Sequence, residues 1–155
     1  MRKIIIYGSV FTLIVSACSQ TSPPQKARGP EITLEVAGPG GAALAGSTST
    51  MADGKTYYCK FSGGNVPGGN GGDVQFTHGP PVTFPVNLHA DAKFSITDVK
   101  FPVDPKHQLS KNAPVTKKQA VIKDINTEVQ QGTYEVHVAD ASAATFVCHP
   151  MIINH

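Results

Sequence analysis

The chain has 155 residues, with 13 Lys and Arg against 11 Asp and Glu, and a formal net charge of +2. This length suits one domain of ordinary size. The near balance of charge excludes a strongly basic chain of the kind that binds nucleic acid. The 15 Gly and 12 Pro indicate many turns and loops between short regular elements.

The first 18 residues have the features of a secretory signal. Arg2 and Lys3 precede an apolar segment over residues 4–15, which is shorter than the roughly 20 residues needed to span a bilayer. Small residues then lead directly to a cysteine, in the run Val15-Ser16-Ala17-Cys18. This run resembles the lipobox of a bacterial lipoprotein signal peptide.

The resemblance implies that residues 1–17 are a cleaved signal peptide and that Cys18, now the first residue, carries a diacylglycerol and a third acyl chain. Each buried CH₂ contributes about 0.8 kcal/mol, so several chains hold a protein stably on a lipid bilayer. Ser19 stands where an Asp would favour the inner membrane, so we expect an outer-membrane lipoprotein facing the periplasm. Loss of Arg2 and Lys3 leaves 11 basic and 11 acidic residues, and we expect no nucleic-acid partner.

Residues 18–30 contain no large apolar side chain and predict a flexible tether, with the folded domain over residues 31–155. In that domain the apolar residues alternate with period two, which is typical of strands. Strands are predicted in Glu31–Ala37, Thr56–Phe61, Val82–Leu88, Phe94–Phe101, Gln119–Val129, Thr133–Val138 and Thr145–Cys148. The spacing of Gln119–Val129 also permits a short helix, but its Ile, Val and Thr residues favour a strand. The pattern predicts an all-β fold: an antiparallel β-sandwich of about seven to eight strands, immunoglobulin-like or cupredoxin-like.

Two predicted strands have irregular features. Pro85 lacks an N–H group, so the segment Val82–Leu88 is expected to be an edge strand or to contain a bulge. Between Phe94 and Phe101 the inward residues change parity. A one-residue bulge or a turn near Thr97-Asp98 would restore a common inward face.

If Cys18 is lipidated, two of the three cysteines remain available to form a disulfide. An even pair in an oxidising compartment favours a disulfide between Cys59 and Cys148. Such a bridge closes a loop of about 90 residues, for which chain entropy predicts at most roughly 4–5 kcal/mol. The alternative is that Cys148 is a metal-binding thiolate.

The C-terminal residues Cys148, His149, Met151 and His155 have the ligand types of a blue-copper site. Their order matches that near the C-terminus of a cupredoxin, but the spacing does not, because adjacent residues of a strand point to opposite faces. A looser copper or zinc site would use His149, Met151 and His155, with His89 as the upstream ligand. The alternative is a disulfide cysteine followed by a surface tail.

A basic stretch lies between residues 100 and 123, with six lysines and one acidic residue. Lys106, Lys111, Lys117 and Lys118 are candidates for contact with anionic lipid headgroups or an envelope polymer. The alternative is a solvated loop that lysines keep soluble. Aromatic residues are not interleaved with these lysines, which argues against a groove for single-stranded nucleic acid.

The motifs of common enzymes are absent from the sequence. There is no GxSxG elbow and no HExxH pair, and Gly54-Lys55-Thr56 lacks the upstream glycine of a phosphate-binding loop. We therefore expect no catalytic residues and no cofactor, and a non-enzymatic lipoprotein that binds an envelope protein or polymer. Two alternatives stay open: a periplasmic copper- or zinc-binding module, and an inhibitor of an envelope-attacking hydrolase. Lysozyme inhibitors are often small lipidated β-proteins with a disulfide, and residues 56–59 resemble a strand of one of them.

Overall fold

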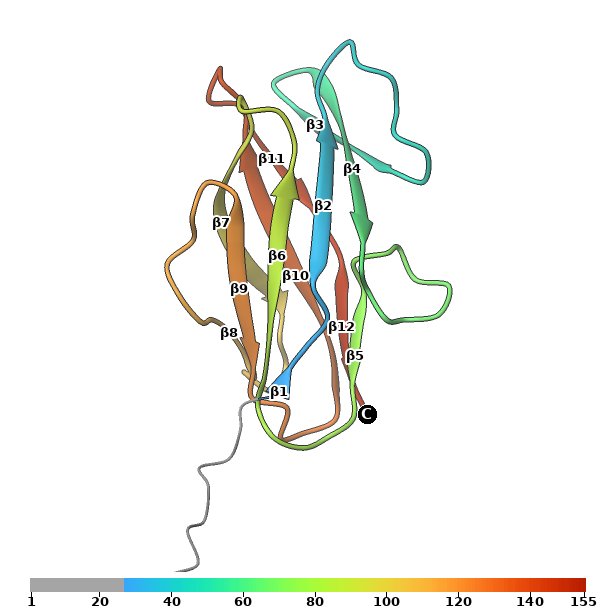
Figure 1. The fold of residues 1–155 in the computed structure, drawn as a ribbon, viewed down its shortest axis with the longest axis vertical. Helices are drawn as coiled ribbons and strands as arrows, with labels where there is room; N and C mark the ends of the chain where they lie inside the picture. The colour runs from blue at the N-terminus through green and yellow to red at the C-terminus, as the bar shows by residue number, and fades with distance from the viewer. Residues whose placement is uncertain (1–26) are drawn as a thin grey trace, which may run out of the picture.

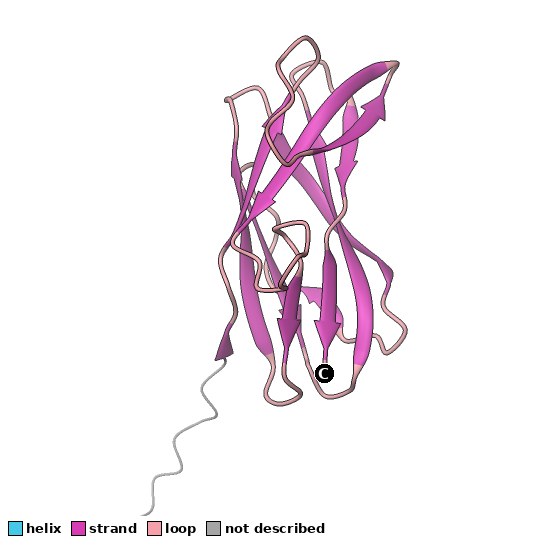
Figure 2. Ribbon diagram, turned by 90° about the vertical axis from the view of Figure 1, so that its right-hand side faces the viewer, coloured by secondary structure: helices cyan, strands magenta, loops and turns pink. Residues whose placement is uncertain are grey.

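The computed structural model describes residues 27–155 (Figure 1). The expected signal peptide and lipobox, with Cys18, and residues 18–26 of the expected tether lie outside this part. The described residues form 12 strands and no helix, as the all-β prediction requires, and Figure 2 shows only strands and loops.

The strands form two sheets. Sheet A has seven: β1 (Ala27–Arg28), β2 (Ile32–Ala37), β3 (Thr48–Ala52), β4 (Lys55–Ser62), β6 (Val82–His89), β8 (Leu109–Lys111) and β9 (Gln119–Asp124). Sheet B has five: β5 (Val74–Phe76), β7 (Ser95–Val103), β10 (Gln130–Ala139), β11 (Thr145–Cys148) and β12 (Met151–Asn154). β1 begins inside the segment expected as the end of the tether, and pairs with β6.

The core lies between the two sheets and follows from the period-two pattern. Ile32 and Leu34 of β2 are fully buried, as are Val136 and Val138 of β10, while the residues between them are only partly buried. Each such side chain contributes roughly 1.5–3 kcal/mol on full burial. Each of the seven predicted strand segments overlaps an observed strand, because alternation marks the face that the other sheet covers.

The prediction of an antiparallel sandwich is wrong in its pairing. Both sheets are mixed, because β6 pairs in parallel with β1 and β2, and β5 pairs in parallel with β12. Parallel neighbours need a long connection. Between β2 and β6 this connection is made by β3, β4 and β5, the last of which lies in the other sheet. Five short strands that the alternation did not reveal raise the strand number to 12.

Pro85 lies in a central strand, so the expectation of an edge strand is wrong. β6 has β9 on one side and both β1 and β2 on the other. The Thr83 carbonyl accepts a hydrogen bond from the Gly29 N–H and therefore faces the side of β1 and β2. Backbone groups two residues apart in a strand point to the same side, so the backbone nitrogen of Pro85 also faces β1 and β2. β1 pairs with β6 only up to Thr83 and β2 only from Val86. The missing N–H therefore faces the gap between two partner strands.

The bulge prediction in β7 is confirmed. Ile96 pairs with Val138 and Asp98 with His137, so Thr97 is the extra residue. Ile96 and Val99 are consequently both buried although they differ in parity.

The expectation of a surface tail after Cys148 is wrong. Met151–Asn154 forms β12, which lies between β10 and β5 inside sheet B. As oriented in Figure 1, the chain ends at the lower end of the fold, beside loops 77–81, 104–108 and 125–129. Loops 90–94 and 140–144 form the upper end.

Candidate functional site

A disulfide joins the two sheets. Cys59 of β4 and Cys148 of β11 are bonded, with their Cα atoms 5.9 Å apart, and are 2% and 1% exposed. This confirms the predicted pairing. The Cys148 sulfur is therefore not the thiolate ligand that a blue-copper site requires.

Aromatic rings pack beside this disulfide toward the upper end. Tyr57 stacks on Phe146 with ring centroids 4.2 Å apart, and the Tyr57 hydroxyl donates to Asp140 Oδ2 at 2.7 Å. This hydrogen bond, together with burial, raises the pKa of Tyr57 to about 12. Donation from the Ser142 hydroxyl, and then from Tyr57, lowers the pKa of Asp140 to about 2. The pair ties the 140–144 turn of sheet B to β4 of sheet A.

The C-terminal metal-ligand candidates lie along a strand and do not converge. Met151 and His155 are four residues apart, which in extended backbone is about 13 Å. Met151 Sδ accepts a hydrogen bond from Gln131 at 3.6 Å, and His155 Nε2 lies 3.3 Å from the Gln75 side-chain oxygen. Separate polar partners therefore hold these two side chains.

The other two candidates lie near different sheets, because His149 follows β11 of sheet B and His89 ends β6 of sheet A. His149 Nδ1 is 3.5 Å from Glu135 Oε1, whereas His89 ends β6 and pairs across sheet A with Glu35. Among residues 27–155, no group of three His, Cys, Asp or Glu side chains is placed to hold a metal ion. In the described residues, the geometry gives the alternative hypothesis, a copper or zinc module, no assembled ligand set of these types.

The four candidate lysines do not form one surface. Lys106 is at the lower end and pairs with Glu128 at 3.1 Å, while Lys117 and Lys118 precede β9 at its opposite end. Lys118 Nζ donates to the carbonyls of residues 90, 91 and 94, each at 3.0 Å. Lys111 pairs with Asp98 at 2.8 Å and lines a surface hollow of about 550 Å³. Three of the four thus serve internal contacts.

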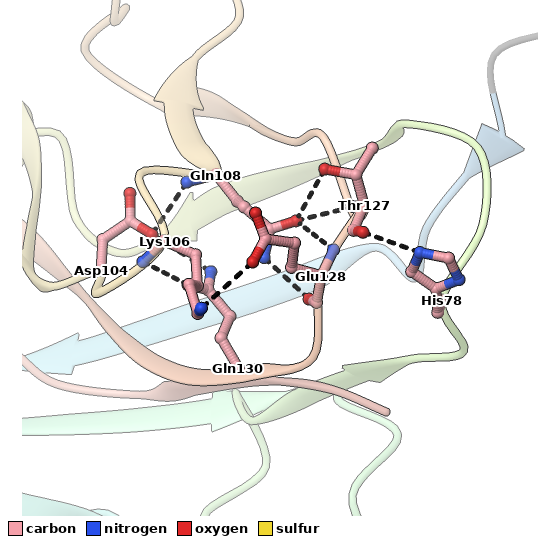
Figure 3. A network of polar contacts seen from close by, with 7 residues as sticks. All are labelled: His78, Asp104, Lys106, Gln108, Thr127, Glu128 and Gln130. Carbon is pink, nitrogen blue, oxygen red and sulfur yellow. Dashed lines mark hydrogen bonds and ion pairs between the residues drawn. The ribbon is translucent and has the colours of Figure 1, made fainter.

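A network of polar contacts closes the lower end (Figure 3). Gln108, 2% exposed, connects loop 104–108 to loop 125–129. Its side-chain oxygen accepts from the Thr127 N–H at 2.6 Å and the Glu128 N–H at 2.9 Å, and its amide nitrogen donates to the Glu128 carbonyl at 2.8 Å. Gln108 therefore supplies the hydrogen bonds that a neighbouring strand would otherwise give.

Asp104 holds the start of the same network. Its carboxylate accepts from the backbone N–H groups of Gln108 and Leu109, at 2.9 and 3.0 Å, and from the Gln130 side chain at 3.1 Å. At the edge of the network, His78 Nε2 lies 2.7 Å from the Thr127 carbonyl. The side chains of Asp104, Gln108 and Gln130 therefore hold loops 104–108 and 125–129 in place.

Beside this network lie three buried polar residues whose hydrogen bonding is incomplete. Asp124, Asn126 and Asn154 are at most 1% exposed. Asp124 Oδ2, Asn126 Oδ1 and Asn154 Oδ1 are the buried side-chain atoms without a partner in the described part of the chain. Each unmet buried acceptor costs about 1–3 kcal/mol. Burial raises the pKa of Asp124, against the lowering effect of donors from Asn126 and Asn154.

An uncharged edge strand forms a different kind of surface. Residues 38–52 contain no charged side chain, β3 is the last strand at one edge of sheet A, and Met51 is 69% exposed. The other edge strand, β8, is three residues long and ends in Lys111. Natural edge strands are usually short or protected by charge. β8 follows this rule and β3 does not.

No protein-family model matches the chain, and no curated protein matches it in sequence. Over residues 27–155, no helix has the length and hydropathy needed to cross a membrane.

Proposed function

We propose that the chain is a lipid-anchored, non-enzymatic module of the bacterial cell envelope that binds an envelope protein by strand addition at β3. The observation that carries the proposal is the buried disulfide between Cys59 and Cys148. Disulfides persist in oxidising compartments, so this bond supports a location outside the cytoplasm. The two facing sheets support a sandwich architecture, for which we keep the immunoglobulin-like or cupredoxin-like type.

The position of β1 supports the expected anchoring. Ala27 is nine residues after Cys18, and nine residues span at most about 32 Å. β1 lies at the lower end of the fold (Figure 1). An anchor on Cys18 would keep this end near the bilayer and leave the upper end, with β3, available to partners.

The chemistry of β3 supports the kind of partner. An exposed strand edge offers unpaired backbone N–H and C=O groups, and an extended peptide can pair with them as an added strand. The neutral Ser and Thr side chains of β3 tolerate many partner sequences, and Met51 adds an exposed apolar contact. A polymer that binds through charge would find no complementary charge on this strand.

Anchoring is tested by Cys18→Ala. We expect the variant to lose acyl labelling and to leave the outer-membrane fraction or remain unprocessed. A second measurement, thiol trapping in intact cells, should find Cys59 and Cys148 oxidised in the parent. Unchanged acylation and fractionation in Cys18→Ala would show that the lipobox interpretation is wrong.

Binding is tested by site-specific photo-crosslinking in intact cells. A crosslinker at Ser49 of β3 should give a discrete adduct, and the same group at Ser110 of β8 is the matched control. Adding Met51→Lys, which places a charge on the edge, should abolish the adduct without unfolding the domain. Equal yields of bulk membrane proteins from both positions would contradict the proposal.

A further inference from the structure

The three unpartnered oxygens of the lower end belong to Asp124 and to two residues that each donate a hydrogen bond to it. Asp124 ends β9, Asn126 lies in the following loop and Asn154 ends β12. Asp124 Oδ1 accepts from the Asn126 backbone N–H at 2.8 Å and from Asn154 Nδ2 at 3.3 Å. The second carboxylate oxygen and both carboxamide oxygens are left without a donor.

The orientation of the two carboxamides follows from their hydrogen bonds. Asn126 Nδ2 donates to the Thr77 carbonyl at 2.8 Å, and Asn154 Nδ2 donates to Asp124. Exchanging nitrogen and oxygen in either side chain would place two acceptors against each other. Both nitrogens are therefore in use, and the oxygens are the atoms that remain.

Neutral partners do not satisfy three acceptors together. A proton on Asp124 Oδ2 would give a donor to one other oxygen at most, and one water has only two hydrogens to donate. A cation differs because it can coordinate several oxygens at once. No ion pair in the described residues includes Asp124, and the lysine of the neighbouring network, Lys106, pairs with Glu128.

The donor set indicates the kind of cation. One carboxylate and two carboxamide oxygens are hard ligands, which suit calcium better than copper or zinc. Asp124 is the one acidic residue of this cluster, and the other two oxygens come from carboxamides. The carboxylate of Asp104 lies near enough to act on Asp124 electrostatically and adds negative charge to the region.

We propose that Asp124, Asn126 and Asn154 form a calcium-binding site that joins β9, the β9–β10 loop and β12. The remaining ligands of calcium, which takes six to eight oxygens, would be water or backbone carbonyls. With a single carboxylate, the affinity belongs to the weak class of extracellular modules, with Kd about 10⁻⁴–10⁻³ M. Because the ligands are buried in the folded state, binding is coupled to stability.

The test is equilibrium unfolding of the full disulfide-bonded chain, with calcium chloride or EDTA at constant ionic strength. About 10 mM calcium should raise the folding equilibrium constant roughly 10- to 100-fold, and isothermal titration should give one calcium per chain. Asp124→Asn should abolish both effects. No calcium binding in the parent chain, an equal stabilisation by magnesium, or retained binding in Asp124→Asn would overturn the proposal.

A matched control exists in the same chain. Asp73 is 2% exposed, but both of its oxygens accept backbone N–H groups, from Met151 at 2.7 Å and Asn70 at 3.0 Å. Asp73→Asn should destabilise the fold and keep the full calcium response. If Asp124→Asn does not fold, Asn154→Ala provides the second variant, because the loss of one of the three protein oxygens should weaken calcium binding at least tenfold. Unchanged affinity in Asn154→Ala would count against the site.

Discussion

The two ends of the fold are held together by different chemistry. Toward the upper end, a disulfide and a ring stack join the sheets, and the buried hydroxyl of the stacked Tyr57 has its acceptor in Asp140. At the lower end, loops meet through Gln108, Asp104 and the Asp124 cluster, where every buried polar atom needs a partner. The upper end is thus complete within the chain, whereas the lower end leaves three acceptors open.

The largest expected effect concerns the upper end. The double substitution Cys59→Ala and Cys148→Ala removes a crosslink across a sequence separation of 89 residues. Chain entropy predicts a loss of about 4–5 kcal/mol in the free energy of unfolding. Urea unfolding of the oxidised parent and the variant measures the loss. An unchanged free energy would mean that the noncovalent contacts alone hold this end.

The next effect concerns the lower end. Gln108→Ala leaves the backbone groups of Thr127 and Glu128 without their partners, so we expect a loss of about 3 kcal/mol. Hydrogen exchange at these two amides should accelerate more than exchange in β11. The exposed Gln119, which bonds to Asn87, is the control, and Gln119→Ala should cost less than about 0.5 kcal/mol. If Gln108→Ala accelerated hydrogen exchange equally in both regions, the two ends of the fold would not be stabilised separately.

The stability of the upper end is expected to depend on pH. Tyr57→Phe removes one of the donors that hold the pKa of Asp140 at about 2, so this pKa should rise part of the way toward 3.8. The stabilisation from Asp140 is present above pH 3.8 and is lost as the pH falls through about 2. That from Tyr57 is present below pH 10 and is lost as the pH rises through about 12. NMR titration of the carboxyl in both proteins measures the shift, and an identical pKa would exclude the hydrogen bond.

The smallest effect concerns a surface pair at the lower end. Lys106 and Glu128 are each about half exposed. Glu128→Gln should therefore cost less than about 1 kcal/mol and should cost least in high salt. Unfolding at two salt concentrations checks this, and a large loss that salt does not reduce would assign Glu128 a role in the network itself.

Alternation predicted seven strand segments and the bulge near Thr97-Asp98, because each depends only on which face of a strand is covered. It could not predict the parallel pairing of β2 with β6, because neighbours in a sheet are chosen by packing between distant segments. The copper hypothesis rested on ligand types alone, and extended backbone separates Met151 from His155.

The lower-end cluster was missed, although the sequence carries a signal for it. Asp124 has the same parity as the buried Ala120 and Ile122, and Asn154 has the same parity as Ile152. A polar residue at an inward position of a strand indicates a buried polar contact. The partners themselves depend on loop geometry, which the pattern does not contain.

The interior position of β12 has a consequence for the order of folding. Sheet B cannot be completed until the four residues of β12 are present, since β12 separates β10 from β5. Cys59 likewise cannot form its disulfide with Cys148 until the 89 residues that separate them in sequence have emerged. A chain delivered from its N-terminus therefore cannot complete sheet B before β12 has emerged, and a truncation that removes β12 should destabilise the fold.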